Sequence, residues 1–184
     1  MRSIIISLLV AFVVTLMPAQ VKVVHFKKLQ ECLPSKAMTG FDRKKPIGQT
    51  QSAMGMSTSE ASVQYQEPYK EGKEGETVPP QVSFTVKIQD MAAIPYALMP
   101  YAWMQESESE SEDGYSKTVT VNGTYKGMEE GKTGDSKSCK LTFGVANRYI
   151  VSIEVENKQD DKFLKSIVDV VDLAKLEKLT AEAK

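Results

Sequence analysis

The sequence predicts an α+β fold in which helices cover an antiparallel β-sheet of about five or six strands. Several segments alternate apolar and polar residues, the period of a half-buried strand, and follow one another through short turns. Other segments have the 3.6-residue period of amphipathic helices. Strands and helices do not alternate along the chain, so an antiparallel sheet with covering helices is expected rather than a doubly wound parallel one. An α-β-α sandwich is one arrangement that fits.

Residues 1–20 have the character of a signal peptide. Arg2 is followed by an uncharged apolar run, Ile4 to Met17, which is short of the roughly 20 residues of a membrane span. An uncleaved anchor or a buried helix is the alternative interpretation. We expect an exported protein, periplasmic or secreted, with residues 21–184 as its single domain and no stable membrane span after cleavage.

The first part of this domain predicts a helix, two strands and the connection between them. Residues 25–33 carry apolar side chains at helical spacing, and Pro34 ends this short N-terminal helix. Residues 61–65 and 82–88 alternate apolar and polar side chains, which predicts two strands. Between them, residues 67–80 contain two glycines and three prolines among charged residues, which predicts an exposed connection.

A central apolar helix is predicted next. Residues 91–104 are almost wholly apolar, but the run is too short to span a bilayer. Pro95 and Pro100 each remove a helical hydrogen bond, so we expect a kinked or two-piece helix. Its composition predicts that it is buried on most sides.

The remaining strands are predicted as hairpins. Residues 115–121 and 124–128 flank Asn122-Gly123, a strong two-residue turn because both positions tolerate positive φ. Two more strands are expected at residues 140–143 and 148–155.

A long C-terminal helix closes the chain in this interpretation. Asp160 or Asp161 provides its N-cap, and apolar residues at helical spacing continue as far as Leu179.

Composition and charge exclude some classes of function. The formal net charge of -1 argues against a nucleic-acid binder, which would carry a basic stripe. No nucleotide-binding or metalloprotease motif is present, so no cofactor and no metal are expected. An envelope protein or a hydrophobic ligand is the kind of partner that the sequence leaves open.

The sequence predicts no catalytic residue. Its one histidine, His25, lies just after the predicted signal peptide and is a poor candidate for a Ser-His-acid triad. Asp90 follows a strong strand and is the carboxylate that an enzyme of the carboxylate-pair type would use. The alternative is that Asp90 caps the helix after it.

Three groups of residues are candidates for binding or cross-linking. Tyr96, Met99 and Trp103 could line a groove for a hydrophobic ligand, or they could be ordinary core residues.

The second group is acidic. It lies in the segment 106–113, where glutamate and serine alternate. If this segment is extended, its four glutamates point the same way. The segment could then be a solvated spacer or a strip that weakly binds a cation or a basic partner. Its spacing does not fit an EF-hand. The glutamates are Glu106, Glu108, Glu110 and Glu112.

The third group is the cysteine pair. Cys32 and Cys139 could form a disulfide in an oxidising compartment. Two buried, unpaired thiols are the alternative, which the sequence slightly favours.

Short motifs spread over residues 26–179 resemble a group of bacterial exported proteins of unknown function. They are LQECLPSKAMTGFDRKKPIG, STSEASVQY, VSFTVKIQD, DGYSKTVTVNG, NRYIVSIEVEN and VVDLAKLEKL. The same features are loosely similar to the PsbP-like fold, an α-β-α sandwich around an antiparallel sheet. In both groups the motif residues look structural, so the resemblance implies no catalytic set. The cysteine pair and the acidic segment depart from it.

The sequence therefore predicts an exported, non-enzymatic binding or accessory module of the cell envelope. The alternatives are a carboxylate-dependent envelope enzyme centred on Asp90 and a carrier of a hydrophobic ligand.

Overall fold

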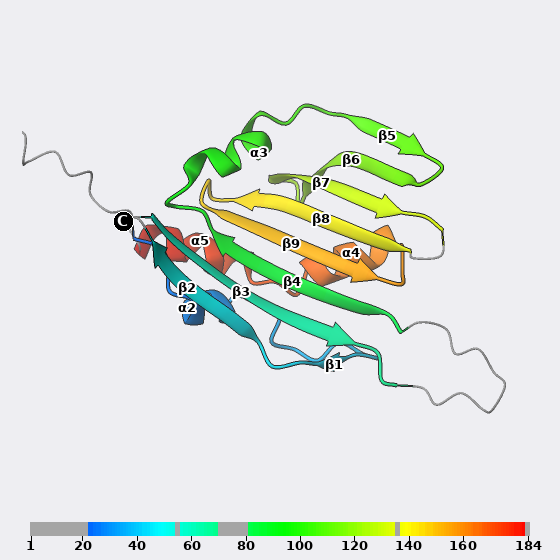
Figure 1. Cartoon of the computed structure of the whole chain (residues 1–184), viewed down its shortest axis with the longest axis horizontal. Helices are drawn as coiled ribbons and strands as arrows, with labels where there is room; N and C mark the ends of the chain where they lie inside the picture. Colours follow the sequence, from blue (N-terminus) through cyan, green and yellow to red (C-terminus); the bar gives the residue numbers. More distant parts are fainter. Residues whose placement is uncertain (1–21, 54–55, 70–80, 135–136, 183–184) are drawn as a thin grey trace, which may run out of the picture.

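The computed structural model describes residues 22–53, 56–69, 81–134 and 137–182 (Figure 1). The predicted signal peptide, residues 1–20, lies outside the described residues, as does most of the predicted connection at 67–80.

Across these described ranges, one antiparallel sheet of nine strands dominates the fold, so the α+β prediction is confirmed but the expected five or six strands were too few. The order across the sheet is β1-β3-β4-β9-β8-β7-β6-β5, and β2 pairs with β3 beside β1. The strands are β1 (Asp42–Arg43), β2 (Ile47–Ala53), β3 (Met56–Gln66), β4 (Ser83–Asp90), β5 (Glu108–Ser111), β6 (Gly114–Val121), β7 (Tyr125–Lys132), β8 (Ser138–Val145) and β9 (Tyr149–Glu156).

The strands that sequence reasoning missed lie at the two edges of the sheet. None of β1, β2 and β5 contains a buried residue, because the side chains of an edge strand have few core residues to pack against. An alternating apolar pattern arises only where one side of a strand is buried, so these strands carry no such signal.

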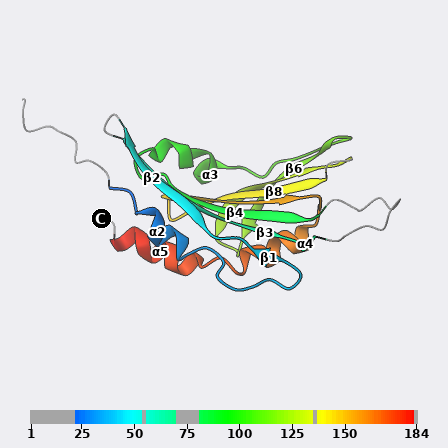
Figure 2. The same ribbon diagram turned by 60° about the horizontal axis from the view of Figure 1, so that its bottom comes forward.

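Three helices cover one face of the sheet. They are α2 (Phe26–Gln30), α4 (Asp161–Val168) and α5 (Leu173–Glu182), and Figure 2 shows them together on one side. The core lies between them and the inward side chains of the central strands. In register across three strands, for example, Phe84 pairs with Tyr65 on one side and Val155 on the other, and all three are fully buried.

The C-terminal region forms two helices, whereas one long helix was expected. Asp160 caps the first, as predicted, by accepting hydrogen bonds from the N–H groups of Lys162 and Phe163. The break comes from a second cap. The carboxylate of Asp172 accepts a hydrogen bond from the Lys175 N–H, and the Asp172 N–H donates to the carbonyl of Cys32. Aspartate at such a position favours starting a new helix over continuing the old one.

The central apolar segment lies on the opposite face of the sheet (Figure 2). It forms two pieces, the 3₁₀-helix η1 (Pro95–Leu98) and α3 (Met99–Trp103), each with a proline in its first turn. The prediction of two pieces is confirmed, but the expected burial on most sides is wrong. Leu98 is buried on the sheet, whereas much of the segment faces solvent.

This position follows from the path of the chain. After β4 in the middle of the sheet, the chain must reach β5 at the far edge before β6 to β9 return as successive hairpins. The segment η1–α3 makes that crossing over the ends of β8 and β7. It has contact with the sheet on one side only, and this is why its other side is exposed.

Candidate functional site

Tyr96, Met99 and Trp103 form an exposed apolar surface, called here the aromatic strip. Their exposed fractions are 68%, 53% and 78%, which is unusual for large apolar side chains. Spacings of three and four residues place side chains on the same side of a helix. The strip is therefore the outer side of η1–α3.

The inner side of the same segment anchors it to the sheet. Leu98 is buried, and both Leu98 and Tyr101 lie within van der Waals distance of the space that a Cβ at Gly144 would occupy. A cavity of about 400 Å³ beneath the segment is lined by Leu98, Tyr101 and neighbouring residues of β7, β8 and α5. The residues of the strip are not part of that lining. Because Tyr96, Met99 and Trp103 are exposed, the interpretation that they are ordinary core residues is wrong, whereas a ligand groove lined by them stays a prediction.

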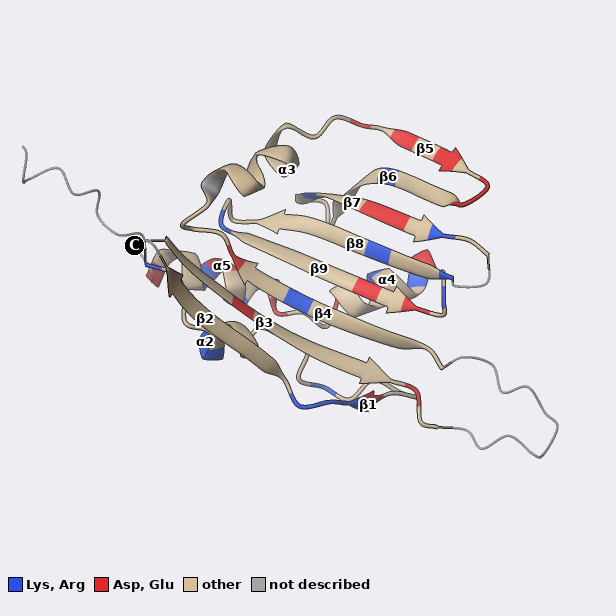
Figure 3. Ribbon diagram, in the orientation of Figure 1, with Lys and Arg blue, Asp and Glu red and all other residues tan. Residues whose placement is uncertain are grey.

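Part of the acidic segment, which was expected to be a solvated spacer or a weak binding strip, is a strand whose residues are all exposed. Its residues Glu108–Ser111 form β5, which pairs with β6 and leaves its other side as an edge of the sheet (Figure 3). Glu108 lies opposite Lys117 and Glu110 opposite Tyr115, so these two glutamates point to the same side, as the strand period requires. Among the residues that the structure describes, no group of three or more metal-ligating side chains is close enough to hold an ion.

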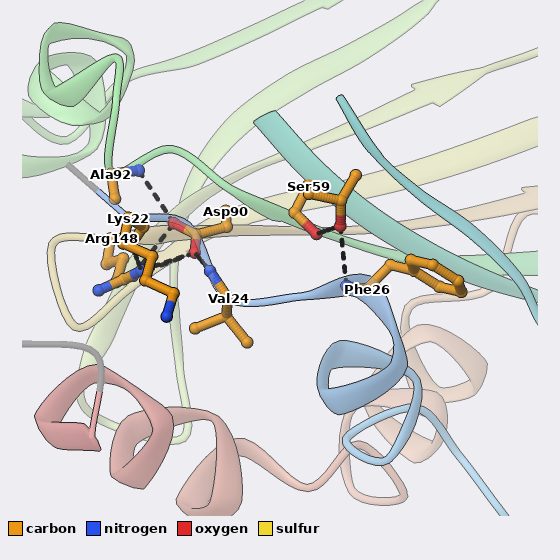
Figure 4. Close-up of polar contacts among 8 residues, drawn as sticks. Lys22, Val24, Phe26, Ser59, Asp90, Ala92 and Arg148 are labelled. Atoms are coloured by element: carbon orange, nitrogen blue, oxygen red, sulfur yellow. Dashed lines mark hydrogen bonds and ion pairs between the residues drawn. The ribbon is translucent and has the colours of Figure 1, made fainter. Parts of the chain in front are cut away.

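Asp90 forms a buried ion pair with Arg148. The Asp90 side chain is fully buried, and its carboxylate accepts hydrogen bonds from Arg148 Nη2 at 2.8 Å and Nε at 3.1 Å (Figure 4). The N–H of Val24 donates to it at 2.6 Å and the N–H of Ala92 at 2.9 Å. Arg148 Nη2 also donates to the Lys22 carbonyl at 2.9 Å.

This arrangement fastens the N-terminal segment 22–24 to β4 and to the turn before β9. Asp90 also stabilises a turn through Ala92, but it does not cap a helix directly, because η1 begins only at Pro95. A carboxylate that accepts from a guanidinium and two backbone N–H groups is typical of a structural ion pair. A general base would instead need reach to a substrate proton.

A cavity of about 590 Å³ lies next to this ion pair and is called here the N-terminal cavity. It is bounded by the N-terminal segment, the paired ends of β2 and β3, and the end of α5. Its lining residues are Lys22, Val23, Val24, His25, Lys28, Thr50, Ser52, Ser57, Leu179 and Glu182. Sequence reasoning could not find it because these residues come from four separate parts of the chain.

A second buried carboxylate, Glu129, was also missed. The Tyr115 hydroxyl shares its one hydrogen between the carboxylates of Glu129, at 2.8 Å, and Asp161, at 3.1 Å. The Lys117 ammonium lies 3.0 Å from Glu129 and 2.7 Å from Asp161. Gly131 makes this possible, because a Cβ there would collide with the Tyr115 ring.

The protonation of this cluster indicates a structural role. Hydrogen bonding to Asp161 raises the pKa of Lys117, and the same contact with Lys117 lowers the pKa of Asp161. Burial and the neighbouring Glu129 raise the pKa of the Tyr115 hydroxyl. Lysine and tyrosine therefore both keep their protons at neutral pH, which suits a bridge between the sheet and α4 and does not suit a nucleophile.

Cys32 and Cys139 are both buried and free. Their thiols donate to different carbonyls, Cys32 to Lys28 and Cys139 to Lys158. Burial raises the pKa of Cys32 to about 11, so its reactive thiolate form is scarce at neutral pH.

Comparison with protein-family models, with curated protein sequences and with solved structures found no match. Within the described part of the chain, no helix is both long and apolar enough to cross a membrane.

Proposed function

We propose that this protein is an exported, non-enzymatic binding module of the cell envelope that docks a partner protein through the aromatic strip. The observation that carries the proposal is that Tyr96, Met99 and Trp103 are exposed side by side on η1–α3, whose opposite side packs on the sheet. Clustered exposed apolar side chains mark interaction sites, and tyrosine, tryptophan and methionine are enriched at protein interfaces.

Charge favours a protein over a lipid surface as the partner. Residues 91–116, which include the strip, contain five acidic residues and no lysine or arginine. Peripheral helices that bind anionic membranes rely on basic residues beside their apolar face. Lys126 reaches the end of the segment, but its ammonium donates to the Met104 carbonyl. We infer that the partner offers an apolar groove with a basic rim.

Export is the part of the proposal that rests on sequence. It is supported by the apolar run behind Arg2 and by the resemblance to bacterial exported proteins and, more loosely, to the PsbP-like fold. The two alternatives have less support. An enzyme centred on Asp90 would have to use a carboxylate that is already engaged by Arg148. The carrier that the sequence suggested would hold its ligand in the cavity beneath η1–α3, which the strip does not line.

Site-specific photo-crosslinking in the host cell tests the docking surface. A photoreactive amino acid replaces Tyr96, Met99 or Trp103, and in a control chain it replaces Ala174, which is exposed on α5 on the other side of the sheet. We expect one discrete protein adduct from the three strip positions and none from position 174.

The crosslinked protein is then purified and its affinity measured. We expect Trp103→Ser to weaken binding at least tenfold, as truncating a central aromatic anchor usually does, while the melting temperature stays unchanged because Trp103 is exposed. Adducts that do not depend on position, or a Trp103→Ser variant that binds normally, would contradict the proposal. Adducts to lipid alone would show that the strip binds a membrane.

A further inference from the structure

The N-terminal cavity lies on the face of the sheet opposite to the aromatic strip. It is formed beside α2 and α5, whereas η1–α3 lies across the other face (Figure 2). A volume of about 590 Å³ falls within the range of about 300–1,000 Å³ that is usual for small-molecule sites. The cavity and the strip are therefore separate surfaces that can be tested independently.

The floor of the cavity is apolar. It is made by Val23 and Val24 of the N-terminal segment and by Leu179 of α5, and all three are buried with less than a tenth of their surface exposed. Such a floor favours an aliphatic or aromatic group of a ligand, because burying that group removes apolar surface from water.

The ion pair described above holds this floor in place. Arg148 binds the carbonyl of Lys22, and Asp90 binds the N–H of Val24, so the backbone on both sides of Val23 is fixed from the sheet. Further along, the N–H of Phe26 donates to the hydroxyl of Thr50, which in turn contacts Ser59 at 2.9 Å (Figure 4). A wall fixed by such contacts needs little ordering when a ligand enters, which favours affinity.

The rim of the cavity is more basic than acidic. Two cations, Lys22 and Lys28, line it together with one acid, Glu182, while the Nδ1 of His25 accepts a hydrogen bond from the Lys27 N–H. Lys28 and Glu182 are paired across the rim at 3.3 Å, but both side chains are more than half exposed, so the pair is weak and easily exchanged. Lys22 has no side-chain partner among the described residues. Excess positive charge at the mouth of an apolar cavity is complementary to an anionic head group.

We propose that the N-terminal cavity binds an amphipathic anion, a molecule with an apolar chain or ring and one carboxylate or phosphate group. The apolar part lies on Val23, Val24 and Leu179, and the anionic group is held at the rim by Lys22 and Lys28. Ser52 and Ser57, whose hydroxyls contact each other at 2.8 Å, supply a polar wall between these two ends.

Nuclear magnetic resonance of the methyl groups tests this site directly. The protein is used in the form that its host cell produces, and its valine and leucine methyl groups are isotopically labelled. It is titrated with dodecanoate and with dodecyl phosphate, each below its critical micelle concentration. Dodecyltrimethylammonium, which has the same chain and the opposite charge, is the control ligand. We expect saturable shifts at Val23, Val24 and Leu179 with one or both anions, and at least tenfold weaker binding of the cation.

Two charge variants separate the site from general attraction to lysines. In one, Lys22→Glu and Lys28→Glu reverse the rim. In the matched control, Lys162→Glu and Lys165→Glu change the net charge equally at exposed positions of α4, outside the cavity. We expect about a tenfold loss of anion affinity in the rim variant alone.

Each remaining outcome has a clear meaning. Equal binding of anion and cation, or an equal loss in both charge variants, would overturn the proposal. Shifts confined to the residues around Tyr96 and Trp103 would place the ligand on the strip and would also overturn it. Because the docking proposal is tested by crosslinking on the other face of the sheet, either proposal can fail while the other stands. The difference between dodecanoate and dodecyl phosphate shows which head group the site prefers.

Discussion

Asp90 shows how one side chain can join three parts of the chain. Its carboxylate meets Arg148 from 58 residues away and Val24 from 66 residues away, inside a fully buried site. Burying a charge is costly unless it is paired and fully hydrogen-bonded. The site therefore tolerates little change in either partner, although neither residue has a chemical task in the proposed function.

We expect Asp90→Asn to lower the free energy of unfolding by about 3–5 kcal/mol, the usual cost of removing one partner from a buried ion pair. Arg148 would remain buried without its counter-charge. Urea unfolding followed by circular dichroism measures this loss.

The matched control is Glu60→Gln, which removes a partly exposed pair with Lys87 at 3.3 Å in the neighbouring strand. Exposed pairs contribute little, so a loss of less than about 1 kcal/mol is expected there. If Asp90→Asn lowered the free energy of unfolding no more than Glu60→Gln, the Asp90–Arg148 ion pair would not be an important source of stability.

At the scale of elements, β5 illustrates how acidic residues suit a sheet edge. Its backbone N–H and C=O groups on the outer side pair with no strand among the described residues, and such an edge can recruit another chain. Charged side chains discourage that pairing. The alternating glutamates of this segment therefore protect an exposed edge of the sheet, which the composition alone did not indicate.

We expect a variant with Glu108→Val and Glu110→Val to aggregate faster as protein concentration rises, with its melting temperature unchanged or higher. Valine favours strands and removes the charge that protects the edge. Light scattering during incubation measures the rate. A variant with Glu108→Lys and Glu110→Lys is the control and should remain soluble, and equal aggregation of both variants would refute this role.

The sequence predicted those elements whose signal comes from local burial or turn chemistry. The strands β4 and β9 alternate clearly, and the turn between β6 and β7 has positive φ at Asn122 and Gly123, as an Asn-Gly hairpin requires. The edge strands and the break before α5 could not be predicted in this way. Their causes are a position in the sheet and a hydrogen bond from Asp172 to Cys32, which is distant in sequence.

The candidate sites divide in a similar way. The sequence singled out Tyr96, Met99 and Trp103, but it could not show which side of their helix would meet the sheet. It singled out Asp90 without Arg148, because nothing local links the two residues. The Tyr115 and Glu129 cluster was not predicted, and its one local sign was the pair of glycines that flank Glu129 at alternate positions in β7.

For the whole molecule, the shifted pKa values predict that the free energy of unfolding is constant near neutral pH and falls in both acid and alkali. Burial raises the pKa of Cys32 from 9.0 to about 11, so the folded state holds a proton that the unfolded state releases. The contribution of Cys32 to the free energy of unfolding is therefore fully present below pH 9 and is lost as the pH rises toward 11. Tyr125, whose pKa rises to about 12 through burial and Glu177, acts in the same direction at higher pH.

The acid limit has the opposite sign. Lys117 lowers the pKa of Asp161 below its ordinary 3.8, so the folded state favours the ionised carboxylate. That contribution is present above about pH 4 and is lost as the pH falls further. We expect unfolding free energies measured from pH 2 to 11 to fall at both ends. The alkaline slope should flatten in Cys32→Ala and the acid slope in Asp161→Asn, and unchanged slopes would contradict these assignments.

The pairing of β4 with β9 also has a consequence for how fast the protein folds. Ser83 pairs with Glu156, so the middle of the sheet can close only after more than seventy intervening residues have been made. The link from Arg148 to Lys22 spans 126 residues. Contacts between such distant positions slow the search for the native state, and domains dominated by them fold in milliseconds to seconds rather than microseconds. Until β9 arrives, β4 has a free edge, and a newly made chain is most exposed to mispairing during that interval.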